Sequence, residues 1–137
     1  MPLRLSEQET IMNASVAINA YSTTKKQTIS PQEVGYKVIS SALHKLDTNL
    51  SILISNQDSK ETAKAYERSL LTIYFLQKSL DLNSGSDLAK NLFRLYEFCR
   101  TTLLDKGISG SQDDPDLKKC HSFINEIMES WDTAMPQ

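Results

Sequence analysis

A strongly apolar stretch, Leu70–Leu76, lies in the middle of a run without proline or glycine that extends from Glu61 to Asp81. Such a run predicts one long helix. Its apolar residues fall on two stripes at helical spacing, one with Leu70, Ile73 and Tyr74, which Gln77 continues, and the other with Leu71, Phe75 and Leu82. Because a helix that faces one core needs a single stripe, we expect this helix to be covered on two sides, by its own chain or by a partner.

A preceding helix is predicted to begin at Ser30 and to run to about Asn56. Ser30 can cap it, the proline that follows fits the first helical position, and Glu33 completes a capping box. Asp58 can cap the next helix, with Glu61 at its third position. The apolar positions of the first helix recur along one face, namely Val34, Val38, Ala42, Leu46, Leu50 and Leu53.

Two more amphipathic helices follow the break at Asn83-Ser84-Gly85. The third helix is expected to begin at a capping box of Ser84 and Asp87 and to end at Lys106-Gly107. The fourth opens at Asp114-Pro115-Asp116, with an acidic cap and proline at the first position. Their predicted core faces are Leu88, Leu92, Leu95, Cys99 and Leu103 in the third helix, and Leu117, Cys120, Ile124, Ile127, Met128 and Trp131 in the fourth.

These patterns predict an all-α fold, an antiparallel up-and-down bundle of four long helices. No segment shows the sustained alternation of a strand, and short connections make successive helices antiparallel neighbours. We assign residues 30–137 to the bundle domain. Residues 1–29 are expected to be a flexible N-terminal appendage with a short amphipathic helix in the region of Ser6 to Ile18.

Composition excludes several classes of function. Of the 137 residues, 39% are hydrophobic and 23% charged, and the net charge of −2 comes from interspersed charges without a basic stripe. Nucleic acid is therefore an unexpected partner. No apolar run has the length of a membrane span and no signal peptide is visible, so we expect no membrane insertion and a cytosolic location. Cys99 and Cys120 are expected to be buried, reduced thiols.

The histidines do not predict an enzyme. A helical His44 suggests a histidine phosphotransfer domain, but the third and fourth residues after it are Asp47 and Thr48, and an acid there would repel a phosphoryl group. His121 has no second histidine at helical spacing, and no di-iron, phosphate-loop or nucleophile motif is present. We expect neither a catalytic site nor a metal or other cofactor.

The surplus apolar surface of the second and third helices predicts a binding groove for an amphipathic segment. The candidate groove residues are Leu71, Tyr74 and Phe75 on the second helix and Leu92, Phe93 and Tyr96 on the third. The alternative is that these side chains meet the other helices and the N-terminal segment inside an ordinary core.

Three stretches together resemble the flagellin-specific export chaperones of the FliS family. The first is Asn19-Ala20-Tyr21 followed by Ser30-Pro31-Gln32-Glu33-Val34, which is similar to the family's tyrosine motif and helix start. The second is Leu80-Asp81-Leu82 and Gly85, then Leu88-Ala89, Asn91-Leu92 and Leu95-Tyr96. The third is Trp131 after Ile124 and Ile127. In this chain Ile18 and Tyr21 occupy the positions of the family's paired tyrosines.

The resemblance implies a chaperone that binds the disordered C-terminal segment of flagellin, prevents premature polymerisation and delivers it to the flagellar type III export apparatus. The implied partners are that segment and a component of the export gate. Ile18 and Tyr21 are expected to cap part of the groove in the free protein. A helical-bundle adaptor with another partner is the alternative, because a fold does not determine function.

Overall fold

The computed structural model describes residues 31–55, 58–84 and 87–134. Four long helices are present in these residues: α3 (Pro31–Ser55), α4 (Ser59–Ser79), α5 (Asp87–Lys106) and α6 (Pro115–Ala134). A 3-10 turn, η1 (Leu82–Ser84), precedes α5. The expected short helix in residues 1–29 lies outside the described residues.

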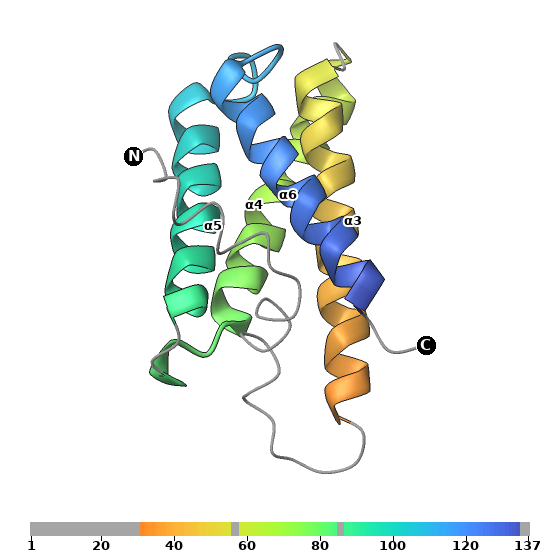
Figure 1. Cartoon of the computed structure of the whole chain (residues 1–137). Coiled ribbons are helices and arrows are strands. Elements are labelled where there is room, and N and C mark those ends of the chain that lie inside the picture. Colours follow the sequence, from red (N-terminus) through yellow and green to blue (C-terminus); the bar gives the residue numbers. More distant parts are fainter. Residues whose placement is uncertain (1–30, 56–57, 85–86, 135–137) are drawn as a thin grey trace.

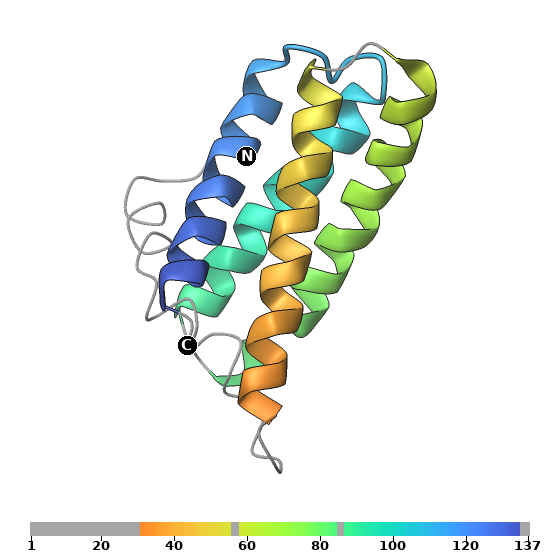
Figure 2. The same cartoon turned by 90° about the vertical axis from the view of Figure 1, so that its right-hand side faces the viewer.

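The four helices run antiparallel around one shared core (Figures 1 and 2). α3 packs against α4 and α6, and α5 packs against the same two helices. Each helix thus contacts both of its neighbours in a closed ring, with the order α3, α4, α5, α6. The predicted all-α, up-and-down bundle is confirmed. No described helix is long and apolar enough to cross a membrane.

The predicted core face of α5 is confirmed, and that of α6 is confirmed except at Met128, which is only partly buried against the core. Both helices bury one stripe almost completely, with Leu88, Leu92, Leu95, Cys99 and Leu103 from α5 and Leu117, Cys120, Ile124, Ile127 and Trp131 from α6. Cys99 and Cys120 are free thiols, as predicted. Contact with the Cys120 thiol, together with burial, raises the pKa of Cys99.

Trp131 joins the end of α6 to the beginning of α3. Its indole Nε1–H donates a hydrogen bond to the backbone oxygen of Tyr36 at 3.0 Å. The two rings also meet edge to face, with centroids 5.7 Å apart. A fully buried indole must find an acceptor for its N–H, and this contact provides one where the two helices meet.

The predicted core face of α3 is wrong at Val38, which is 45% exposed, whereas Ile39 and Leu43 are buried. The reason is geometric. Residues four apart are separated by about 400° around a helix with 3.6 residues per turn, so a stripe read at this spacing rotates by about 40° at each step. The rotation takes Val38 out of the core while Ala42, Leu46, Leu50 and Leu53 stay in it.

The predicted caps of α4 and α6 are confirmed. The Asp58 carboxylate accepts hydrogen bonds from the backbone N–H groups of Lys60 and Glu61. Asp114 accepts from the backbone N–H of Leu117 at 2.9 Å and lies 3.2 Å from Lys106 Nζ at the end of α5. Before α5, by contrast, Ser84 belongs to η1, and the helix begins at Asp87.

Candidate partner-binding groove

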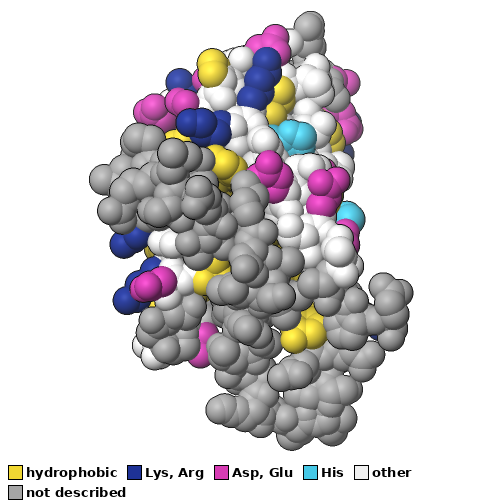
Figure 3. Space-filling view, in the orientation of Figure 1, with side chains coloured by type: hydrophobic (Ala, Val, Ile, Leu, Met, Phe, Trp, Pro, Cys, Tyr) yellow, Lys and Arg dark blue, Asp and Glu magenta, His cyan; other side chains and the backbone are white. Residues whose placement is uncertain are grey.

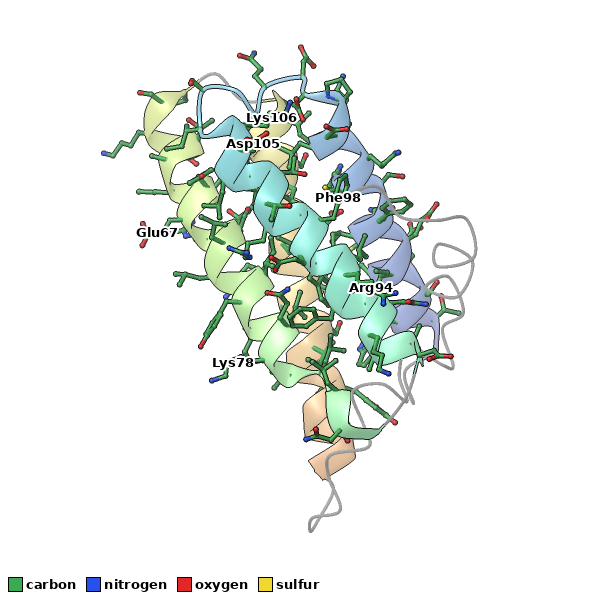
Figure 4. All side chains as sticks on the ribbon, turned by 90° about the vertical axis from the view of Figure 1, so that its left-hand side faces the viewer. Glu67, Lys78, Arg94, Phe98, Asp105 and Lys106 are labelled. Carbon is green, nitrogen blue, oxygen red and sulfur yellow. The ribbon has the colours of Figure 1, made fainter. Side chains whose placement is uncertain are left out.

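Several positions of α4 depart from the usual pattern of buried apolar and exposed polar side chains. Leu71, Tyr74 and Phe75 are 62%, 59% and 40% exposed, whereas Gln77 and Thr72 on the same helix are buried. Leu71, Tyr74 and Lys78 recur at helical spacing, and Lys78 Nζ lies 5.5 Å from the centre of the Tyr74 ring. Figure 4 shows Lys78 pointing outward from α4 on the side away from α5. Exposed large apolar side chains gathered on one face are the kind of feature that marks a binding surface.

A groove of about 510 Å³ lies next to this face, between α3 and α4. Its lining residues are Lys37, Val38, Ser41, Ala42 and Lys45 from α3, with Leu71, Thr72 and Phe75 from α4.

Apolar groups dominate the contact surface of the groove. Val38 on α3 and Leu71 and Phe75 on α4 are its exposed large apolar residues, and Ala42 and Thr72 are the most deeply buried of its lining. Thr72 Oγ1 donates to the backbone oxygen of Arg68 at 2.7 Å, so its hydroxyl is satisfied within α4. A partner that covers this groove would bury apolar area without leaving the Thr72 hydroxyl unpaired.

The structure does not bring the six predicted groove residues into one surface. Leu71 and Phe75 line the groove, and Tyr74 is exposed on the same helix. Leu92 and Tyr96 are completely buried in the core, and Phe93 is half-buried against it. The groove therefore lies on the α3 side of α4, whereas the side that faces α5 is packed.

A polar network crosses the α4–α5 interface. The side-chain amide of the buried Gln77 donates to Glu97 Oε1 at 3.0 Å, and the Arg100 guanidinium donates to both oxygens of the same carboxylate. The pKa of Glu97 is lowered to about 2, mainly by the hydrogen bond from Arg100. Burial acts in the opposite direction, and the hydrogen bond from Gln77 lowers the pKa further. This network holds α4 and α5 together, which is consistent with a groove on the other side of α4.

Sequence reasoning missed the contribution of α3 to the groove. The apolar pattern places Val38 on the core face, and nothing in it distinguishes Lys37 and Lys45 from other exposed lysines. A helical projection at 3.6 residues per turn would have placed Val38 beside Lys45, on the border of the buried stripe, because the two residues are seven apart.

Two histidine–aspartate contacts connect α3 and α6 on a different face (Figure 3). His44 Nε2 lies 2.6 Å from Asp132 Oδ2, while Ser40 Oγ donates to Asp132 Oδ1 at 2.9 Å. In the second contact the histidine is on α6 and the aspartate on α3: His121 Nε2 lies 3.0 Å from Asp47 Oδ1, but without hydrogen-bond geometry.

These histidines lie in an interhelical contact that ties α3 to α6. The imidazole of His44 faces a carboxylate, an unfavourable position for accepting a phosphoryl group. Within the described residues, no group of three or more His, Cys, Asp or Glu side chains could hold a metal ion.

Ile18 and Tyr21, the predicted cap residues, lie outside the described part of the chain.

Comparison with known families gives a match over residues 12–137, all but the first eleven residues, to the family described as flagellar protein FliS. Comparisons with curated proteins and with solved structures gave no significant match.

Proposed function

The chain belongs to the FliS family of flagellar proteins, and from this premise we propose that it holds the C-terminal segment of unassembled flagellin in the groove between α3 and α4. Membership of the family implies the role of a flagellin export chaperone, a role without enzymatic activity. In the proposed mechanism the protein acts in the bacterial cytosol, prevents premature polymerisation and delivers its client to the flagellar type III export apparatus.

One observation carries the assignment of the groove, namely three large apolar side chains exposed along it. Val38, Leu71 and Phe75 lie on two adjacent helices and are each at least 40% exposed. A client segment that is disordered as a monomer leaves its own apolar side chains free to associate, and an apolar groove can cover them. Holding such a segment requires burial of apolar area and no chemical step, which agrees with a chaperone that needs no cofactor.

The test is suppression of flagellin polymerisation, followed by light scattering after addition of filament seeds. An equimolar amount of the full-length protein should suppress growth. The double variant Leu71→Ser/Phe75→Ser should bind the client at least about tenfold more weakly, because each large apolar side chain contributes about 1.5–3 kcal/mol when buried. Both positions are already exposed, so circular dichroism should show a folded bundle.

The matched control is Leu104→Ser on α5, which removes a leucine that is 52% exposed and outside the groove. This variant should suppress polymerisation as well as the wild type. Equal suppression by the wild type and the Leu71→Ser/Phe75→Ser variant would contradict the assignment of the groove.

We further propose that the N-terminal segment around Ile18 and Tyr21 covers part of the groove in the free protein. The support is the presence in the sequence of a short apolar segment beside a bundle whose described residues form an apolar groove. A competing cap lowers the apparent affinity for flagellin by the fraction of time for which the groove is closed.

Deletion of residues 1–24 should therefore tighten binding of the flagellin segment in a fluorescence anisotropy titration. Unchanged affinity would exclude a cap. Weaker binding would instead assign direct client contacts to these residues.

A further inference from the structure

The charged side chains that line the groove are positive and lie on its α3 wall. Among the described residues that line it, the two ionisable side chains are Lys37 and Lys45, and both come from α3. The lining residues of α4 within the described chain are Leu71, Thr72 and Phe75. The groove therefore combines an apolar wall on α4 with a cationic edge on α3.

The two lysines are spaced for a helical ligand. Lys37, Ser41 and Lys45 follow one another at intervals of four residues, so they lie along one side of α3. Eight residues of helix rise by about 12 Å. A helix lying along α3 would place acidic side chains opposite both ammonium groups if those acids were seven or eight residues apart.

We propose that the groove selects an amphipathic helical segment with an acidic edge, and that Lys37 and Lys45 determine this selection. This inference rests on the proposed function. The apolar stripe of the ligand packs against Val38, Leu71 and Phe75. Two carboxylates, seven or eight residues apart on its flank, lie opposite the lysines. The stripe supplies most of the affinity, while the paired charges fix the register and orientation of the ligand and reject segments with a basic flank.

Two synthetic helical peptides of roughly 18 residues, about 27 Å long, serve as probes. Both carry the same leucine stripe and an N-terminal fluorophore. One has glutamate at two flanking positions eight residues apart, and the other has lysine at the same two positions. Each is titrated with the full chain and followed by fluorescence anisotropy, with the flagellin C-terminal segment titrated in parallel.

The decisive variant is Lys37→Glu/Lys45→Glu. Its matched control is Lys90→Glu/Lys119→Glu, which makes the same change in net charge at exposed lysines of α5 and α6 outside the groove. Thermal unfolding of both variants verifies that the bundle is intact.

The wild type should bind the glutamate-flanked peptide about tenfold more tightly than the lysine-flanked peptide. This difference in affinity combines two modest attractions between surface charges in the first complex with the two repulsions that replace them in the second. The preference should reverse in Lys37→Glu/Lys45→Glu and persist in the control. It should weaken strongly in about 1 M salt, where the screening length is about 3 Å.

Equal binding of both peptides by the wild type, or a preference that both double variants share, would overturn the charge selection. If the flagellin segment binds in the same experiment, the proposed function survives that result. Failure of the flagellin segment, together with tight binding of the glutamate-flanked peptide, would instead reject flagellin as the client and retain the selection.

Discussion

At the scale of single residues, α4 buries Ile73 and Leu76 in the core, but it also buries several polar side chains and leaves large apolar ones exposed. Three of the four buried polar side chains of α4 are satisfied: Thr62 and Thr72 donate to backbone oxygens of their own helix, and Gln77 donates to Glu97. The fourth, Ser69, has no hydrogen-bond partner for its hydroxyl among the described residues. Burial of a hydrogen-bonded polar group costs little, whereas exposure of Leu71 and Phe75 forgoes the free energy of burying them. Stability alone therefore does not account for the outer face of α4, which supports the proposal that a partner covers it.

The Glu97 carboxylate should make stability depend on pH. Its pKa falls from 4.5 to about 2 in the folded bundle, so its contribution is present above pH 4.5 and is lost as the pH falls toward 2. Because the side chain is 39% exposed, solvent limits this contribution to no more than about 1 kcal/mol. Urea unfolding from pH 5 to pH 2.5 should show a flatter pH dependence for Glu97→Gln than for the wild type.

The variant Arg100→Gln provides the control for the cause, since the guanidinium is the main group that lowers this pKa. It should flatten the same pH range, and adding Glu97→Gln to it should change little more. Identical slopes for the wild type and Glu97→Gln would show that the Glu97 pKa is not lowered in the native state.

At the scale of the elements, sequence signals located the helices well and the groove only in part. Asp58 and Asp114 cap their helices as predicted, because capping depends on a few adjacent residues. Adjacent residues alone do not determine which face of α4 is buried and which is exposed. Leu71 and Leu92 are both leucines on amphipathic helices, yet one is exposed and the other completely buried. Which face is buried depends on the rotation of each helix against its neighbours, and this is a property of the assembled bundle.

The connection between α5 and α6 should be intolerant of a side chain at Gly110. A Cβ at this position would clash with the backbone oxygen of Lys106, and Gly107 before it has a φ of 69°. Gly110→Ala should lower the free energy of unfolding by about 1–3 kcal/mol through overpacking against the backbone. Urea denaturation measures the change.

Gly35→Ala is the matched substitution with the opposite expected sign. Gly35 lies within α3, and a Cβ there would meet nothing within 4 Å. Alanine should stabilise the helix by roughly 0.5–1 kcal/mol because it restricts the unfolded chain more than glycine does. Destabilisation by Gly35→Ala, or no effect of Gly110→Ala, would contradict the local geometry.

At the scale of the whole molecule, the ring of four helices encloses a shared core and forms an apolar groove between α3 and α4 at its outer surface. Leu92 and Tyr96 fill the interior, and Trp131 ties α6 to α3, so a client can be held without opening the bundle. The groove lies on the α3 side of α4, while the Gln77–Glu97–Arg100 network joins the other side to α5. A closed bundle with an exposed groove suits the proposed role of holding a disordered client and later releasing it.

The most direct test of this account is calorimetric titration of the full-length protein with the C-terminal segment of flagellin at several temperatures. Burial of apolar surface in the α3–α4 groove predicts stoichiometric binding, with a dissociation constant of about 1 μM or lower and a negative heat-capacity change. The heat-capacity change should be smaller in magnitude for Leu71→Ser/Phe75→Ser. Absence of binding, for the full chain and after removal of residues 1–24, would contradict the proposal that this bundle is a flagellin chaperone.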